Sequence, residues 1–223
     1  MKDRYSRNSI LSPSQQKLIA EKKVAVIGSG GLGGYVAEML ARLGIRHIVI
    51  CDGDSFDVSN LNRQIFCTED NLGKNKASEA CKRIKKINSE VSVKSFEVFY
   101  SCVNSAEILK GCDAVIDCLD TPSDKLQLSV GCADADIPLI HGAVNGWFGQ
   151  VCTVFPGENT LKNLYGVNQN TVDLPGNPSF SPAVIAGIQV SEAVKVLLGE
   201  KPVLRNKALF VDLFSCEFKE VEL

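Results

Sequence analysis

The chain has 223 residues, of which 45% are hydrophobic and 22% are charged, and its formal net charge at pH 7 is −2. These proportions are typical of a globular protein that is long enough to bury a sizeable core, and the near-neutral charge gives no basic surface for nucleic acid or an anionic membrane. No apolar run reaches the roughly 20 residues of a membrane span, and the polar N-terminal stretch lacks a signal core, so we expect a cytoplasmic protein.

The nine cysteines favour the same compartment. Their number is odd, no two are spaced as Cys-x-x-Cys, and several lie in apolar stretches where a thiol behaves as a small hydrophobic group. We therefore predict free thiols in a reducing environment and no structural zinc site built on paired Cys-x-x-Cys motifs.

Apolar periodicity predicts strands and helices in alternation along the chain. An N-terminal arm and helix occupy residues 1–22, where Ser12 and Pro13 suit the N-cap and the first position of a helix. The further elements, in order, are strand 24–27, helix 33–43, strand 48–51, helix 74–88, strand 91–99, strand 114–118, helix 123–133, strands 139–140 and 150–155, helix 183–198, and strands 209–213 and 217–221.

This order of elements predicts an α/β fold of the Rossmann-like, doubly wound type. The sheet is expected to be mainly parallel, with antiparallel strands at the C-terminal end, in a single domain over residues 1–223. One long segment, residues 156–182, shows no periodicity and is rich in Asn, Gly and Pro. A segment of this kind inside a compact domain is typical of a functional loop.

A glycine-rich motif, residues 28–33, follows the first strand and opens the first helix of the predicted sheet. It has the form GxGxxG, with Gly28, Gly30, Gly31 and Gly33. In this context the glycines let the backbone approach a phosphate, while the helix N-terminus supplies amide donors and a positive dipole. The alternative is a tight turn without a ligand. The motif predicts nucleotide binding but does not identify the nucleotide.

A carboxylate, Asp52, ends the second predicted strand, 24 positions after Gly28. Such a carboxylate accepts hydrogen bonds from ribose hydroxyls, in NAD as in ATP. The alternative is a solvated loop acid.

Two cations, Arg63 and Lys76, come next along the chain. Arg63 offers a planar fork and Lys76 a point charge, and such cations suit the triphosphate of ATP better than the diphosphate of NAD. Each alone would more often be a surface charge, but together with the glycine motif they favour a functional site.

Another carboxylate, Asp120, follows the fourth strand. Ligands of an open α/β sheet lie beyond the carboxyl ends of the strands, so Asp120 is expected to face the nucleotide. There it suits Mg²⁺, with phosphate oxygens completing the coordination. The alternative is that Asp120 caps the next helix.

These motifs together resemble one enzyme family. The run Asn60-Leu61-Asn62-Arg63-Gln64, with the glycine motif upstream and Asp120 downstream, is similar to the ThiF/MoeB/HesA group, the prokaryotic relatives of ubiquitin-activating enzymes. The opening Arg4-Tyr5-Ser6-Arg7 also resembles the start of that group, and the similarity extends to about Gly199.

The resemblance implies an adenylyltransferase that uses ATP and Mg²⁺ to activate the C-terminal carboxylate of a small ubiquitin-like carrier ending in Gly-Gly, with release of pyrophosphate. Such enzymes act in thiamine or molybdopterin biosynthesis, and a sulfur donor would be a separate protein. The implied roles are phosphate binding for Gly28, Gly30, Gly31, Gly33, Asn60, Arg63 and Lys76, ribose binding for Asp52, and Mg²⁺ binding for Asp120. A homodimer is implied, with Arg7 reaching the partner's ATP and the carrier tail lying under a crossover loop at 156–182.

The chain also departs from that family. Residues 160–163, where many relatives have their first Cys-x-x-Cys pair, read Thr-Leu-Lys-Asn, and Cys216 stands alone near the C-terminus, so no zinc is expected. The loop has no cysteine between Cys152 and Cys216 for a covalent carrier intermediate, whereas adenylation itself needs no thiol.

Three other functions compete with this interpretation. One is a related enzyme that adenylates a peptide C-terminus or a modified tRNA base, although the slightly acidic balance weighs against tRNA. Another is a non-catalytic nucleotide-binding subunit, which the combination of Arg63, Lys76 and Asp120 disfavours. The last is an NAD-dependent oxidoreductase, which the cations disfavour. His47 and His141 are expected to be structural, because no nucleophile or ligand pattern accompanies them.

Overall fold

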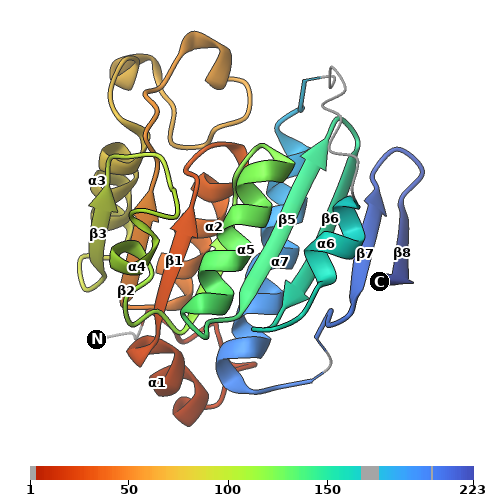
Figure 1. Ribbon diagram of the computed structural model, residues 1–223. Coiled ribbons are helices and arrows are strands. Elements are labelled where there is room, and N and C mark those ends of the chain that lie inside the picture. The colour runs from red at the N-terminus through yellow and green to blue at the C-terminus, as the bar shows by residue number, and fades with distance from the viewer. Residues whose placement is uncertain (1–3, 167–175, 202) are drawn as a thin grey trace.

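The computed structural model describes residues 4–166, 176–201 and 203–223 (Figure 1). The described strands form one eight-stranded sheet in the order β3-β2-β1-β4-β5-β6-β7-β8. They are β1 (Lys23–Ile27), β2 (His47–Cys51), β3 (Ser92–Phe96), β4 (Ala114–Asp117), β5 (Leu139–Asn145), β6 (Phe148–Val154), β7 (Lys207–Asp212) and β8 (Glu217–Glu222). The first five are mutually parallel, and β6, β7 and β8 run antiparallel to their neighbours. The predicted mainly parallel sheet with antiparallel C-terminal strands is confirmed.

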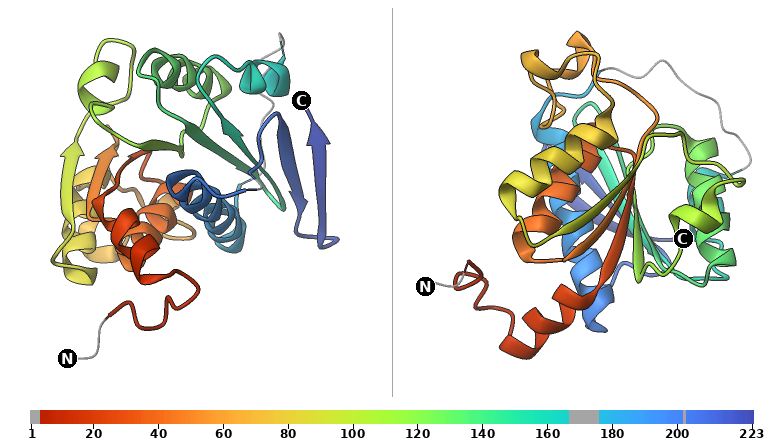
Figure 2. Two further views of the ribbon diagram at one scale, coloured as in Figure 1. Left: turned by 90° about the horizontal axis from the view of Figure 1, so that it is seen from below. Right: turned by 90° about the vertical axis from the view of Figure 1, so that its left-hand side faces the viewer.

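Helices cover both faces of this sheet (Figure 2). They are α1 (Pro13–Glu21), α2 (Gly31–Leu43), α3 (Lys76–Ile87), α4 (Ser105–Ile108), α5 (Pro122–Asp134), α6 (Thr160–Tyr165) and α7 (Phe180–Leu198), with short 3₁₀ turns at Val58–Asn60 and Glu69–Asn71. One core lies under α2, α3 and α7 and includes Val26, Leu40 and Ile185. The other lies under α5 and α6 and includes Ile27, Leu128 and Leu161. With both faces covered, β4 is buried at every position, as expected for a doubly wound sheet.

The switch point of the sheet lies between β1 and β4. The chain passes from β1 to β2 and β3 on one side, then returns to pair β4 with the other edge of β1. In register, Ile27 at the end of β1 is flanked by Cys51 and Asp117. Loops that follow these strands therefore meet at one edge of the sheet, where ligands bind in folds of this type.

Helix α2 connects that edge of the sheet to the opposite one. Gly30 is its N-cap residue, and Gly44 closes it in the left-handed conformation, with φ 96°. Thirteen residues at about 1.5 Å each make the helix about 20 Å long. The two ends of α2 thus mark opposite ends of the molecule.

The N-terminal arm lies at the end remote from the switch point. Figure 1 shows α1 below the sheet, whereas the arrowheads of β1 and β5 point upward. A Cβ atom added at Gly44 would lie 2.7 Å from the ring of Tyr5, and the Tyr5 hydroxyl accepts a hydrogen bond from Asn88 Nδ2 at 3.0 Å. Ser12 is the N-cap of α1 and Pro13 its first residue, as predicted, and Gln15 completes a capping box with Ser12.

Segment 156–182 differs from the prediction that it is irregular throughout. It contains α6, and α7 begins inside it at Phe180. Helix α6 has six residues, too few for a helical period to appear in the sequence, and it forms because Thr160 and Leu161 are buried against the sheet. Residues 167–175 of the predicted loop lie outside the described residues.

Helix α7 corrects the expectation that no apolar run reaches membrane length. Its 19 residues are long and apolar enough to cross a bilayer by length and composition, but half of that window is buried. Ile185, Ala186 and Ala193 are fully buried in the sheet-facing core. The helix is apolar because it packs in the centre of the protein.

Candidate active site

A cleft of about 470 Å³ lies at the switch point, beyond the ends of β1, β2 and β4. Seven residues singled out from the sequence line it: Gly28, Gly30, Gly31, Asp52, Arg63, Lys76 and Asp120. Three do not line it: Gly33, Asn60 and Arg7. The cleft therefore brings together residues that follow three different strands, β1, β2 and β4.

The glycine motif is held close to the end of β4. Gly28 has φ 93°, and a Cβ atom there would lie 2.4 Å from the carbonyl oxygen of Cys118. Gly33 serves packing within the loop, since its Cβ would lie 1.9 Å from the carbonyl oxygen of Gly28. Neither position accepts a side chain, so both glycines are required by the geometry of the turn.

Replacing Gly28 with alanine tests this close approach. We expect the free energy of unfolding to fall by about 2–5 kcal/mol, because a left-handed backbone and a clash with backbone atoms both oppose the methyl group. Gly111→Ala is the matched control, because Gly111 also has positive φ, 67°, but nothing lies within 4 Å of its added Cβ. The free energy of unfolding of Gly111→Ala should fall by only about 1–2 kcal/mol. Urea denaturation measures both; equal losses would show that the contact with Cys118 is unimportant.

Asp52 links the glycine loop to the end of β2. Its Oδ2 accepts a hydrogen bond from the Ser29 amide at 2.6 Å, and its Oδ1 accepts one from the Asp54 amide at 2.8 Å. Burial raises the pKa of Asp52, while these two hydrogen bonds and the nearby Lys76 oppose that rise. The carboxylate is thus oriented by the backbone at the cleft wall, as ribose recognition requires.

The two cations, Arg63 and Lys76, both line the cleft. Lys76 is only 8% exposed, and its Nζ forms an ion pair with Asp54 Oδ2 at 3.1 Å. Arg63 Nη1 donates to the carbonyl oxygen of Ser59 at 3.0 Å and to Asn62 Oδ1 at 2.9 Å. Both side chains are held by neighbouring groups but line the cleft.

Asn60 has a local structural contact instead of a place in the cleft lining. It is 8% exposed, and its Oδ1 accepts a hydrogen bond from the Asp57 amide at 3.0 Å in a reciprocal cap. Through this cap Asn60 shapes the turn that leads to Arg63.

Asp120 is exposed at the cleft, and among the described residues no hydrogen bond or ion pair engages its carboxylate. The suggestion that Asp120 caps the following helix is wrong, because Thr121 is the N-cap of α5 and accepts a hydrogen bond from the Asp124 amide. An exposed carboxylate without a protein partner has the chemistry to bind Mg²⁺. Over the described ranges there is no cluster of three or more His, Cys, Asp or Glu side chains that would hold a metal by itself.

Two buried polar atoms beside the glycine loop have no hydrogen-bond partner: Ser29 Oγ and Gln64 Oε1. Ser29 is 1% exposed and Gln64, which lines the cleft, is 5% exposed. Buried polar groups normally have partners, so the Gln64 Oε1 atom fits a cleft that is completed by a polar ligand, whereas Ser29 lies outside the cleft lining. Gln64 lies in the Asn60–Gln64 run, but nothing in the sequence distinguishes it there from its neighbours.

Asp117 and Lys125 form a buried ion pair beside the cleft. Neither residue was predicted from the sequence as part of the site. Lys125 Nζ lies 3.2 Å from Asp117 Oδ2 and donates to the carbonyl oxygen of Gly142 at 2.9 Å. Burial alone would raise the pKa of Asp117, but the Lys125 charge and a hydrogen bond from His141 hold it below the ordinary value. Lys125 contributes to the cleft lining, so the floor of the cleft carries a buried ion pair.

His141 is structural in the sense predicted from the sequence, since it is fully buried and outside the cleft lining. Burial lowers the pKa of His141. The neutral ring donates from Nδ1 to Asp117 Oδ2 at 2.7 Å and accepts at Nε2 from the Tyr165 hydroxyl at 3.2 Å. His47 is exposed at the start of β2.

Two cysteines, Cys51 and Cys118, line the cleft. Burial raises the pKa of the Cys51 thiol to about 12 and raises that of Cys118 well above its usual range. Both remain protonated near pH 7 and are poor nucleophiles.

Arg7 is exposed in the N-terminal arm, and Tyr5 of that arm packs at Gly44, the end of α2 opposite the glycine loop. Because the arm packs at the Gly44 end of α2, about 20 Å separate it from the glycine loop. Within one chain the structure does not bring Arg7 to the other site residues.

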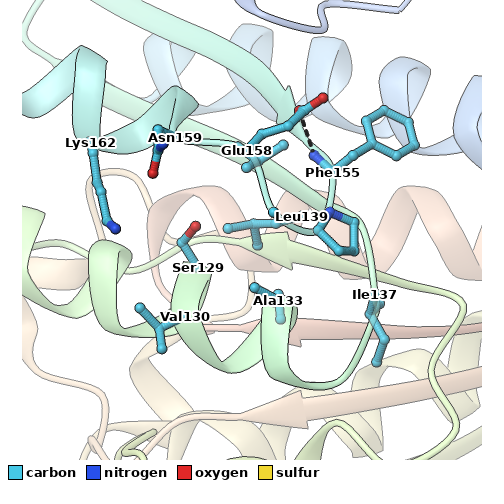
Figure 3. Close-up of a pocket in the computed structure, with 13 residues that line it drawn as sticks. Ser129, Val130, Ala133, Ile137, Leu139, Phe155, Glu158, Asn159 and Lys162 are labelled. Atoms are coloured by element: carbon cyan, nitrogen blue, oxygen red, sulfur yellow. Dashed lines mark hydrogen bonds between the residues drawn. The ribbon is translucent and has the colours of Figure 1, made fainter.

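A second cavity, of about 280 Å³, lies between α5 and the start of α6 (Figure 3). Ser129 and Val130 on one side face Asn159 and Lys162 on the other. None of the residues that line the first cleft line this cavity. Its carboxylate, Glu158, is engaged by the Phe155 amide and by Arg205, which does not suit a metal site.

Known sequences and solved structures are similar to this chain over nearly its whole length. The ThiF family model matches residues 5–223. The SAMP-activating enzyme E1 of Haloferax volcanii is 32% identical over 98% of this chain and 84% of its own length. The sulfur carrier protein ThiS adenylyltransferase of Bacillus subtilis is 35% identical over 99% of this chain and 68% of its own length. A crystal structure of MccB from E. coli with ATP has the same fold, with a TM-score of 0.84 and 22% identity over 99% of this chain and 72% of that one.

Proposed function

Because this chain belongs to the ThiF family, we propose that it is an ATP-dependent adenylyltransferase that activates the C-terminal carboxylate of a small ubiquitin-like sulfur carrier. The observation that carries the proposal is the convergence of the glycine loop, Arg63, Lys76 and Asp120 on one cleft at the switch point. The cleft has the size expected of a nucleotide site, since small-molecule sites measure about 300–1,000 Å³.

The reaction requires two anions to meet. A carrier carboxylate oxygen bonds to the α-phosphorus of ATP, the bond from that phosphorus to the bridging oxygen breaks, and pyrophosphate leaves with that electron pair. Arg63 and Lys76 neutralise phosphate charge, and the amides at the start of α2 donate to phosphate oxygens. Mg²⁺ bound by Asp120 would supply further charge neutralisation. Positioning and electrostatics thus account for the catalysis.

Arg7 enters this mechanism only from a second copy of the chain. Its absence from the lining of its own cleft, with the arm packed at the Gly44 end of α2, supports a homodimer in which Arg7 of one subunit approaches the ATP of the other. An arginine supplied in this way stabilises transition-state charge, as arginine fingers do in other phosphoryl-transfer enzymes.

The carrier tail has a path beside β5. Ala143 and Val144 line the cleft together with Asn177, which lies within the predicted crossover loop at 156–182. Asn177 Oδ1 accepts a hydrogen bond from the Gly146 amide, and its carbonyl accepts one from Asn62 Nδ2. Gly176, Asn177 and Pro182 of segment 156–182 thus belong to the cleft lining, which supports the proposal that a tail ending in Gly-Gly binds there. The proposed setting is a cytoplasmic sulfur-carrier pathway, of the thiamine or molybdopterin type, with a separate sulfur donor.

Thermal unfolding with Mg²⁺-ATP, and separately with NAD, tests the proposal. At 1,000 times its dissociation constant, Mg²⁺-ATP should add about 4 kcal/mol of stability, whereas NAD should add none. Carrier-dependent exchange of labelled pyrophosphate into ATP is the second measurement, with a Gly-Gly-terminated ubiquitin-like protein as substrate and its truncated form as control. Stabilisation by NAD alone would contradict the proposal and indicate a redox or NAD-sensing domain.

A further inference from the structure

The Asp117 carboxylate joins three elements at the floor of the cleft. It ends β4 and is fully buried. Its Oδ1 accepts a hydrogen bond from the Leu119 amide at 3.0 Å, Lys125 of α5 lies 3.2 Å from its Oδ2, and His141 of β5 donates to Oδ2 at 2.7 Å. A carboxylate with this many donors has a fixed orientation.

The orientation of Asp117 matters for the cleft because Leu119 directly precedes Asp120. The bond from the Leu119 amide fixes the loop that carries the Asp120 carboxylate. The same loop touches the glycine motif, since the Cys118 carbonyl oxygen lies against Gly28. Rotation of the Asp117 carboxylate would therefore move Asp120 relative to the phosphate site.

His141 sets the orientation of the Asp117 carboxylate. The Lys125 ammonium lies 3.3 and 3.2 Å from the two Asp117 oxygens and so does not distinguish them, whereas His141 binds Oδ2 alone. The ring is itself fixed, because Nε2 accepts from the Tyr165 hydroxyl and the two rings meet edge to face, with centroids 5.6 Å apart. A chain of contacts thus runs from Tyr165 in α6 through His141 and Asp117 to the Asp120 loop.

We propose that His141 is a positioning residue, which acts through Asp117 and the Leu119 amide to hold the Asp120 carboxylate where Mg²⁺-ATP binds. The inference rests on the proposed function, because that function assigns Asp120 to Mg²⁺. A histidine that only filled the core would satisfy its own hydrogen bonds without affecting the metal dependence of nucleotide binding.

Two polar substitutions distinguish the roles of the two ring nitrogens of His141. In His141→Asn the amide nitrogen can replace Nδ1 and keep the bond to Asp117, whereas in His141→Gln the longer amide replaces Nε2 and loses that bond. Calorimetry gives the dissociation constant of ATP in EDTA and in saturating Mg²⁺. The constant in EDTA divided by the constant in Mg²⁺ measures how strongly ATP binding depends on the metal. We expect His141→Gln to lower this ratio about tenfold, the effect of one hydrogen bond to a charged group. The ratio for His141→Asn should stay within about twofold of the wild-type ratio. The dissociation constants of both variants in EDTA should also stay within about twofold of the wild-type value.

Val151→Ala is the control for a general loss of stability, since Val151 is fully buried in β6 and takes no part in the contacts of Asp117. The inference would be overturned if His141→Gln had the same ratio as the wild type. It would also be overturned if the ratio fell equally in His141→Asn, His141→Gln and Val151→Ala. If Asp120→Asn lowers the ratio and His141→Gln does not, only this inference fails. If the wild-type protein does not bind Mg²⁺-ATP, the proposed function fails with it.

Discussion

Replacing Asp120 with asparagine is expected to lower carrier-dependent pyrophosphate exchange on the order of 100- to 1,000-fold, with little change in the unfolding midpoint. The physical reason is that the carboxylate is exposed, and no hydrogen bond or ion pair within the described part of the chain depends on it. The substitution keeps the shape of the side chain and removes its charge. Exchange rates at saturating ATP over a range of Mg²⁺ concentrations are the measurement.

Asp134→Asn is a suitable control for this experiment. Asp134 is an exposed carboxylate at the last residue of α5, the helix whose first residue lies two positions after Asp120. It lies outside the cleft lining and should keep wild-type exchange. If Asp120→Asn kept full activity as well, the assignment of Asp120 to Mg²⁺ would be wrong.

Replacing Lys125 with methionine is expected to destabilise the protein by about 3–5 kcal/mol at pH 7, because it leaves the Asp117 charge buried without its cationic partner. Asp117 and Lys125 are 0% and 2% exposed, so water does not compensate for the lost ion pair. Urea denaturation at pH 7 gives the change. The double variant Asp117→Leu/Lys125→Met removes both charges and should recover part of the loss; a double variant less stable than Lys125→Met would argue that the buried charge is not the cause.

The same variant has a predicted pH dependence. In the wild type the pKa of Asp117 is below its ordinary value. Asp117 therefore stabilises the folded state at pH values above its pKa in the unfolded chain, about 3.9. This stabilisation is lost as the pH falls through the pKa of Asp117 in the folded protein. In Lys125→Met the buried carboxylate, or His141 beside it, takes up a proton more readily. The stability difference between the wild type and the variant should therefore narrow as the pH falls from 7 to about 4. A constant difference would show that Asp117 does not respond to the removal of Lys125.

The sequence could predict those features whose cause is local. Short apolar runs alternating with amphipathic stretches specify strands and helices, and a GxGxxG motif directly after a strand predicts the phosphate loop. Asp52 and Asp120 could be found because Asp52 directly follows β2 and Asp120 lies three residues after the end of β4, and the carboxyl ends of parallel strands meet at one edge. Gln64 lies inside a motif that was recognised, but only its buried and unpaired Oε1 marks it as a group that faces a ligand.

The tertiary structure alone decided the rest. Lys125 is 8 residues from Asp117 and His141 is 24 residues from it, and only the parallel register of β4 and β5 and the packing of α5 bring the three together. Helix α6 is too short to leave a period in the sequence and depends on burial of Leu161. The position of Arg7 likewise follows from packing of the arm at the far end of α2. Local pattern thus determined the elements and the residues at their ends, whereas contacts between side chains distant in sequence depend on how those elements pack, which no local pattern encodes.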